Sequence, residues 1–137
     1  MDARIELQAE IDAPRQVVFD LVATADGLAR WLDEAAFEPR PGGPVRFRLL
    51  DAEVVGKVVA IDAPQHVSFT WDYPAEPLNA PSVVAFDAIS HGQRTHLTLR
   101  HVGLAGRRSR DDHEALWRFW FPRLVAAAQA TPAATPA

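Results

Sequence analysis

Residues 111–129, which read DDHEALWRFWFPRLVAAAQ, decide the fold of this chain. Apolar side chains recur along the stretch every three or four residues, the spacing that places them on one face of an α-helix. A helix with so much aromatic surface has to pack in a large apolar groove, which the segments upstream must provide. The predicted apolar face comprises Leu116, Trp117, Trp120, Leu124 and Ala128, widened by Phe119, Phe121 and Val125.

The start of this predicted helix and its one proline set its bounds. Ser109 is the expected N-cap, because a serine side chain accepts a hydrogen bond from the first turn. Acidic residues follow where the helix dipole favours negative charge, at Asp111, Asp112 and Glu114. Pro122 lacks the N–H that a helix interior uses, so we expect a kink there. The alternative is two short helices that meet at Pro122.

Composition indicates a single globular domain. The chain has 137 residues, and we expect one domain over residues 1–130 and a disordered tail at 131–137. There is no cysteine, which excludes disulfides and thiolate metal sites. The formal net charge of −4 does not favour nucleic-acid binding. No apolar run reaches the length that spans a bilayer, so we expect a cytoplasmic protein without membrane insertion.

Upstream of the predicted helix, apolar and polar residues alternate as half-buried strands require. In the first such run Ile5, Leu7, Ala9 and Ile11 share one face, and charged or amide side chains share the other. The same alternation returns several times before the C-terminal helix. Strands are expected at residues 4–11, 37–39, 44–50, 53–62, 66–71, 82–90 and 93–101.

Helices and loops separate these strands. Two short helices are expected at residues 12–23, capped by Asp12, and at residues 25–32. Gly56 lies inside a strand, where glycine marks a bulge or a close approach of another backbone. Three prolines make residues 72–81 a long exposed loop. This order predicts an α+β fold, in which six or seven antiparallel strands wrap around the long C-terminal helix.

Four segments carry a family resemblance over nearly the whole chain. They are IDAPRQVVFDLVATADGLARWL at 11–32, GKVVAIDAPQHVSFTW at 56–71, SVVAFDAISHGQRTHLTLRHVGL at 82–104 and HEALWRFWFPRL at 113–124. In this order they resemble motifs of the START-like, or SRPBCC, superfamily, in its branch of homologues of the Hsp90 ATPase activator. The last segment departs from the pattern, because Ala115 or Leu116 stands where a glycine is usual.

This resemblance implies a helix-grip fold, in which a curved sheet wraps around the terminal helix and a cavity lies between them. Members of the superfamily include lipid and sterol carriers, hormone receptors, polyketide cyclases, aromatases and co-chaperone domains. A shared fold does not decide among these activities.

Strand alternation and helix periodicity point one set of large side chains into the space between sheet and helix. We expect this set to line a cavity of a few hundred Å³ beneath Trp117, with the 72–81 loop near its mouth. Ordinary core packing is the alternative for each aromatic ring. His101 would be the polar anchor, and its alternative is a hydrogen-bonded core histidine. The family resemblance adds Trp31 at one end of the cavity. The predicted ligand-binding residues are Trp31, Phe47, Phe69, Trp71, Phe86, Leu99, His101, Trp117 and Phe121.

The sequence contains no recognisable catalytic or metal-binding motif. His113 is an expected neighbour of His101, but two histidines without a third ligand do not define a metal site. We therefore expect no metal and no cofactor. Asp87 falls on the outer face of the predicted sheet, away from this pair. A general-acid role for Tyr73 or His101 rests on the family resemblance alone.

These features favour a binding module for a small hydrophobic molecule, lipid-like or aromatic. The first alternative is an enzyme of the cyclase, aromatase or hydrolase type that uses the same pocket. The second is a protein-interaction module, with a protein partner or a homodimer, as the co-chaperone resemblance implies. A binding module needs a closed apolar pocket with one or two polar anchors, whereas an enzyme needs at least two titratable groups within reach of one point.

Overall fold

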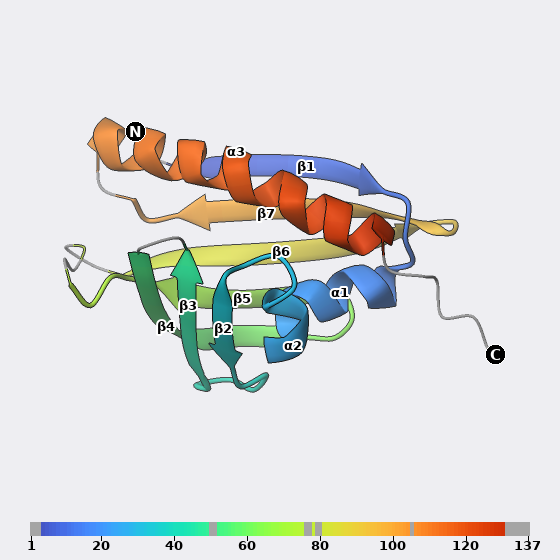
Figure 1. Cartoon of the computed structure of the whole chain (residues 1–137), viewed down its shortest axis with the longest axis horizontal. Coiled ribbons are helices and arrows are strands. Elements are labelled where there is room, and N and C mark those ends of the chain that lie inside the picture. The colour runs from blue at the N-terminus through green and yellow to red at the C-terminus, as the bar shows by residue number, and fades with distance from the viewer. Residues whose placement is uncertain (1–3, 50–51, 76–77, 79–80, 105, 131–137) are drawn as a thin grey trace.

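The fold is one curved antiparallel sheet with helices on its inner side (Figure 1). The computed structural model describes residues 4–49, 52–75, 78, 81–104 and 106–130. The predicted tail at 131–137 and part of the predicted 72–81 loop lie outside these residues. Along the chain the elements are β1 (Ile5–Ile11), α1 (Arg15–Ala23), α2 (Ala25–Leu28), β2 (Glu34–Phe37), β3 (Pro44–Leu49), β4 (Ala52–Asp62), β5 (His66–Trp71), β6 (Ser82–His91), β7 (Arg94–Val102) and α3 (Gly106–Ala130).

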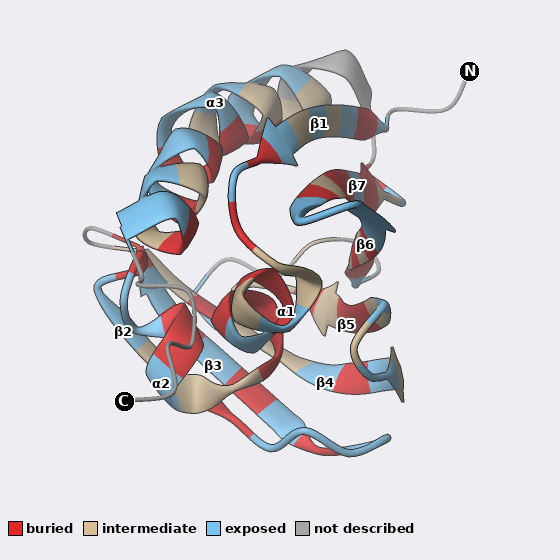
Figure 2. Cartoon of the chain, turned by 90° about the vertical axis from the view of Figure 1, so that its right-hand side faces the viewer, coloured by how far each residue is buried: buried red, intermediate tan, exposed pale blue. Residues whose placement is uncertain are grey.

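The sheet has seven strands in the order β1-β7-β6-β5-β4-β3-β2, and all neighbouring pairs are antiparallel. Figure 2 looks along the molecule and shows the strands curving around α1 and α3, with buried residues on the inner side. An antiparallel sheet needs only one covered face, so its outer face can remain in contact with water. The predicted fold class and the inner position of the long helix are confirmed.

Cross-strand register assembles the inner layer. Phe86 of β6 lies opposite Leu99 of β7, and Val84 lies opposite His101. On the other side of β6, Val84 lies opposite Phe69 of β5. Because side chains alternate along a strand, these residues all point to the same face. Apolar side chains from three adjacent strands thereby form a continuous row under α3.

The long helix differs from its prediction at the N-terminal end. It begins at Gly106, so Ser109 lies inside its first turn and the predicted N-cap is wrong. The Ser109 carbonyl instead accepts a hydrogen bond from His113 Nδ1 at 2.7 Å. Residues 106–108, Gly-Arg-Arg, contain no proline. The helix can therefore begin before its apolar face. Glu114, predicted for the first turn, pairs with Arg110 and Arg118 along the helix surface.

Two further features of α3 bear on its packing. The helix continues through Pro122 to Ala130, so the alternative of two short helices is wrong. Phe119, which was expected to widen the apolar face, is 53% exposed. Its ring packs edge to face on Trp120, and the Arg123 guanidinium lies 5.0 Å from the Trp120 ring. The buried face of α3 is therefore narrower than the sequence indicates.

The first two helices also begin and end differently from their predictions. Pro14 occupies the N-cap of α1 without a side-chain hydrogen bond, so Asp12 is not the cap. The Asp12 N–H instead donates to Gln129 Oε1 at 3.1 Å, which ties the end of β1 to the end of α3. Thr24 caps α2, because its hydroxyl accepts from the Gly27 N–H. That helix ends at Leu28, and β2 starts at Glu34, earlier than the predicted strand at 37–39.

Gly56 marks a close approach between β4 and β5, as predicted. A Cβ atom at this position would lie 1.9 Å from the carbonyl oxygen of Thr70, so only glycine fits. The irregularity in strand pairing lies nearby, between Val58 and Ala60. Among the helices of the described residues, none combines the length and the apolar character that a membrane span requires.

Candidate functional site

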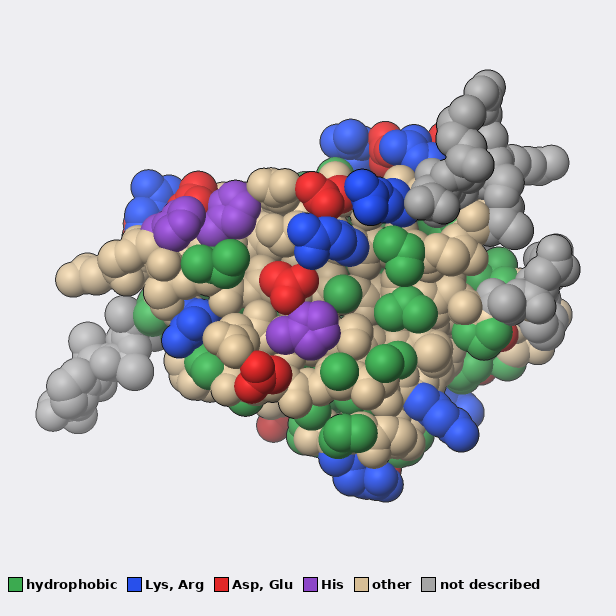
Figure 3. Space-filling view, turned by 180° about the vertical axis from the view of Figure 1, so that it is seen from behind, with side chains coloured by type: hydrophobic (Ala, Val, Ile, Leu, Met, Phe, Trp, Pro, Cys, Tyr) green, Lys and Arg blue, Asp and Glu red, His purple; other side chains and the backbone are tan. Residues whose placement is uncertain are grey.

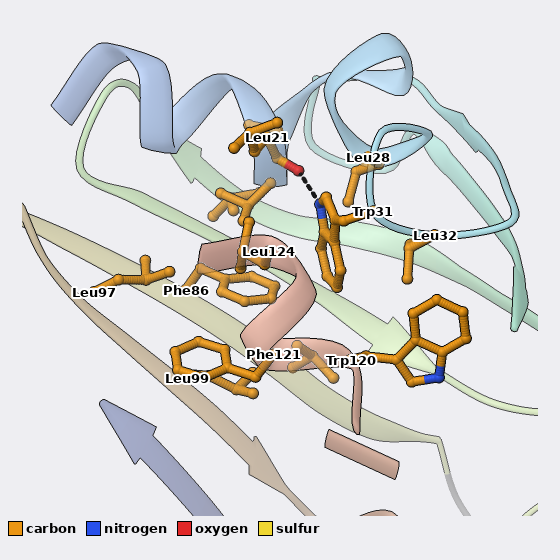
Figure 4. Close-up of a cluster of buried hydrophobic side chains, with 14 of the residues drawn as sticks. Leu21, Leu28, Trp31, Leu32, Phe86, Leu97, Leu99, Trp120, Phe121 and Leu124 are labelled. Carbon is orange, nitrogen blue, oxygen red and sulfur yellow. Dashed lines mark hydrogen bonds between the residues drawn. The ribbon is translucent and has the colours of Figure 1, made fainter. Parts of the chain in front are cut away.

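The structure brings all nine predicted ligand-binding residues into one buried layer between the sheet and the helices. Trp117 of α3 packs edge to face on Phe86, with ring centroids 6.2 Å apart, and tilted on Trp71 at 5.2 Å. Trp31 closes the layer at 6.4 Å from Trp117. Figure 4 shows this layer around Phe86, with side chains from β6, β7 and α3 converging. The remaining predicted members, Phe47, Phe69, Leu99, His101 and Phe121, are also buried.

Two hydrogen bonds hold Trp31 in place. Its indole N–H donates to the Leu21 carbonyl at the end of α1, at 2.7 Å, as the dashed line in Figure 4 shows. This bond satisfies a polar group that would otherwise be buried without a partner. The Trp31 carbonyl in turn accepts a hydrogen bond from Arg123 of α3 at 3.3 Å. The segment after α2 is thus tied to both neighbouring helices.

His101 is fully buried and uses both ring nitrogens. The Trp117 indole donates to Nδ1 at 3.0 Å, and Nε2 lies 2.7 Å from Ser82 Oγ. Because an indole N–H can only donate, Nδ1 is an acceptor and the neutral ring carries its proton on Nε2. Nε2 therefore donates to Ser82, which donates its own proton to the Trp71 carbonyl at 3.0 Å. In this series of hydrogen bonds, the indole N–H of Trp117, both ring nitrogens of His101 and the hydroxyl of Ser82 each have a partner.

This environment keeps His101 neutral. Burial in the aromatic layer, and secondarily the nearby His113, lower the pKa of His101 from its usual 6.5 to about 3. Protonation would also place a second donor against the Trp117 indole N–H. In this arrangement His101 is the hydrogen-bonded core histidine that stood as the alternative, with no ring nitrogen left for a ligand.

A second hydrogen-bonded chain lies beside the first. The Trp71 indole donates to the Tyr73 hydroxyl at 3.0 Å, and that hydroxyl lies 2.7 Å from His113 Nε2. His113 Nδ1 donates to the Ser109 carbonyl, so Nε2 is the acceptor of the Tyr73 proton. The rings of His113 and His101 are 5.1 Å apart and nearly perpendicular. The predicted proximity of these two histidines is confirmed.

Tyr73 stands at the edge of the aromatic layer and is half-buried. Burial raises the pKa of its hydroxyl above the usual value of 10.0. Asp72 positions the residue, because its carboxylate accepts from the Tyr73 N–H and from the Leu78 N–H, each at 2.8 Å. The hydrogen bond from Leu78 thereby ties the described part of the loop back to the end of β5.

The sequence analysis did not identify Ser82 as a site residue, and it considered Tyr73 only as a general acid by analogy with the family. The alternation of inward and outward positions along the strands predicts an inward side chain at both residues. Tyr73 continues the inward positions of Phe69 and Trp71, and Ser82 shares the parity of Val84 on β6. Polar residues on an inward face are informative because they require partners there.

Three pockets that described residues line lie away from His101 and Trp117. One has a volume of about 530 Å³ and lies where β2 and β3 meet the end of α2, beside Phe47 and Arg48. A second, of about 470 Å³, opens on the outer face of the sheet near His66 and Asp87. His101 and Trp117 line neither of these two. The predicted cavity beneath Trp117 therefore stays a prediction.

The arrangement of the sheet and helices identifies the fold class. A curved antiparallel sheet around a long C-terminal helix, with short helices after the first strand, is the helix-grip fold of the START-like superfamily. The chain belongs to the family described as Activator of Hsp90 ATPase homolog 1-like protein, whose model matches residues 12–129. No curated protein sequence matches the chain.

Solved structures with this fold share little sequence with the chain. Protein MLL2253 from Mesorhizobium loti is 21% identical with a TM-score of 0.83, over 93% of this chain and 98% of that one. CalU16 from Micromonospora echinospora is 21% identical with a TM-score of 0.76, over 93% and 76%. Aha1 from Colwellia psychrerythraea, solved as a dimer, is 17% identical with a TM-score of 0.76, over 93% and 96%. At these identities the likeness shows the fold alone.

Proposed function

We propose that this protein binds a small, mainly apolar molecule between the sheet and α3, at the end of the aromatic layer that Tyr73 borders. The observation that carries the proposal is the Tyr73–His113 hydrogen bond of 2.7 Å at the edge of a layer of buried aromatic rings. Small-molecule sites combine apolar walls with a few polar groups that fix orientation. This end of the layer has both.

Exposure favours Tyr73 as the side chain that a ligand meets first. Tyr73 is half-buried, whereas His101, Trp71 and Trp117 behind it are fully buried. Its hydroxyl accepts from Trp71 and donates to His113, so a ligand hydroxyl can take the place of either partner and a ligand carbonyl can take the place of His113 as the acceptor. The ligand class is thus an aromatic or compact aliphatic molecule with one polar group.

Binding at this point requires the rings to move apart, because Trp71 and Trp117 are in contact. The free energy of opening the layer reduces the apparent affinity by the fraction of molecules in the open state. The proposal therefore implies modest affinity for a generic probe and tighter binding for a molecule that fits.

Catalysis and protein docking have less support. Both nitrogens of His101 are engaged, and Tyr73 and His113 bond each other, so the described site leaves no basic nitrogen free to take a proton from a substrate. An interaction module should expose an apolar patch. The large apolar side chains that the described residues expose lie on three separate elements, at Val59, Ile89 and Phe119.

Titration with a fluorescent apolar probe, 8-anilinonaphthalene-1-sulfonate, tests the proposal. We expect saturable binding at one site per chain. Tyr73→Phe keeps the ring but removes the hydroxyl, and should weaken binding by about fivefold, the value of one hydrogen bond. Leu99→Phe adds bulk inside the layer and should also weaken it.

The matched control is Phe119→Ala, which removes an exposed ring on the outer side of α3. It should leave probe binding unchanged. Thermal unfolding of each variant checks that the probe reports a folded protein. Absence of saturable binding, or equal weakening by Phe119→Ala, would overturn the proposal.

A further inference from the structure

Three side chains with metal-ligating atoms meet on the outer face of the sheet, beside the β6–β7 hairpin. Glu10 Oε1 lies 2.6 Å from His96 Nδ1 and 3.0 Å from His91 Nδ1. One ligand atom from each of the three residues lies within 4.8 Å of the others. Figure 3 shows two neighbouring histidine side chains beside an acidic one on this face. The cluster is on the opposite side of the sheet from the aromatic layer.

Strand register fixes these positions. Glu10 of β1 lies directly opposite His96 of β7. On the other side of β7, His96 lies opposite Ile89 of β6, and His91 is two residues further along β6. Residues at i and i+2 of a strand point to the same face, so His91 is the diagonal neighbour of His96. The three ligands thus stand on paired strands and not on a loop.

We propose that Glu10, His91 and His96 form a binding site for a divalent transition-metal cation of the Zn²⁺ type. Two imidazole nitrogens and one carboxylate oxygen are a ligand set that Zn²⁺ takes in proteins, with a fourth position left for water or another molecule. Tetrahedral Zn²⁺ holds such ligands about 3.3–3.5 Å apart, as its bond lengths of about 2.0–2.2 Å require. The observed separations of 2.6 and 3.0 Å need only a small opening, which the exposed side chains of Glu10 and His91 allow.

A second layer of hydrogen bonds orients His96. Its Nε2 lies 3.0 Å from Gln8 Oε1, and the Gln8 amide nitrogen donates to Glu6 at 2.8 Å. Because the carboxylate of Glu6 can only accept, the amide oxygen of Gln8 must face His96. Nε2 of His96 therefore carries a proton, and Nδ1 is directed at Glu10. Such outer partners fix the orientation of ligating histidines at established metal sites.

The cation would lie between His96 Nδ1 and Glu10 Oε1, two atoms that face each other at 2.6 Å. The contacts of Glu10 with His91 and His96 would give way to coordination, whereas Gln8 keeps its hydrogen bond to His96 Nε2. The coordination leaves one open position at the protein surface. The site does not depend on the proposed apolar ligand, since its residues lie on the other face of the sheet.

Isothermal titration of the metal-free full chain with ZnCl₂ tests this site. We expect one Zn²⁺ per chain, and no competition from Mg²⁺, which prefers oxygen ligands. His91→Gln and His96→Gln should each weaken binding at least tenfold. Gln8→Ala should weaken it about tenfold through the orientation of His96.

His66→Gln is the matched control. His66 also contacts a carboxylate on this face, at 2.7 Å from Asp87, but it belongs to no three-ligand cluster among the described residues. Its loss should leave Zn²⁺ binding unchanged. The inference is overturned if wild type shows no stoichiometric binding, or if His91→Gln and His96→Gln bind Zn²⁺ as wild type does. The second result would show that the cation binds elsewhere on the chain.

Discussion

His101 links the stability of the fold to pH. Its pKa is about 3 in the folded protein and about 6.5 in an unfolded chain, so between these values only the unfolded chain binds the proton. Stability from this residue is therefore complete above about pH 6.5 and is lost as the pH falls toward 3. The total loss is at most about 5 kcal/mol, from about 1.4 kcal/mol per pKa unit.

The variant His101→Gln separates this contribution from that of other groups. Its amide oxygen can accept from Trp117 and its amide nitrogen can donate to Ser82, but it does not titrate. Between pH 7 and pH 4.5, wild type should lose about 2–3 kcal/mol more unfolding free energy than the variant. Urea denaturation at both pH values measures the difference. Equal losses in the two proteins would show that His101 is not held neutral.

At the scale of the element, the division of α3 into a buried and an exposed face predicts how much each substitution lowers the unfolding free energy. Trp120 is 3% exposed and the adjacent Phe119 is 53% exposed. Trp120→Ala should lower the unfolding free energy by about 3–5 kcal/mol, because it leaves a large cavity. Phe119→Ala should cost under about 1 kcal/mol. Trp117, with ring partners on several sides and a buried hydrogen bond, should resemble Trp120. Chemical denaturation of the three variants measures this, and a neutral Trp120→Ala would contradict the helix register.

Sequence periodicity was a better guide to the faces of the elements than to their ends. The strands that contain Phe47, Phe69 and Leu99 were predicted almost residue by residue, because alternation is a repeated signal. Helix ends depend on single hydrogen bonds that compete with tertiary contacts. Thus Ser109 lies inside α3 instead of capping it, and the Asp12 N–H donates to Gln129 at the far end of α3.

At the scale of the whole molecule, the sequence allowed the layer to be predicted but not its polar bonding. The inward faces of β3, β5, β6, β7 and α3 were enough to place eight of the nine predicted residues together, and the family resemblance placed Trp31. The direction of each hydrogen bond through Ser82, His101 and Tyr73 depends on distances that no local pattern encodes. The Glu10–His96 contact was still less accessible, because it requires the register of two strands 86 residues apart.

The central claim is that an apolar molecule binds at the Tyr73 end of the aromatic layer. The indole N–H groups of the chain's four tryptophans report on it directly, because each gives its own signal in a ¹H–¹⁵N NMR spectrum. Those of Trp71 and Trp117 donate to Tyr73 and His101, whereas Trp120 lies outside both hydrogen-bonded chains. On titration with 2-naphthol, an aromatic ring with one hydroxyl, the Trp71 and Trp117 signals should shift saturably while that of Trp120 stays in place. Unchanged Trp71 and Trp117 signals at saturating 2-naphthol, or a shift confined to Trp120, would contradict the claim.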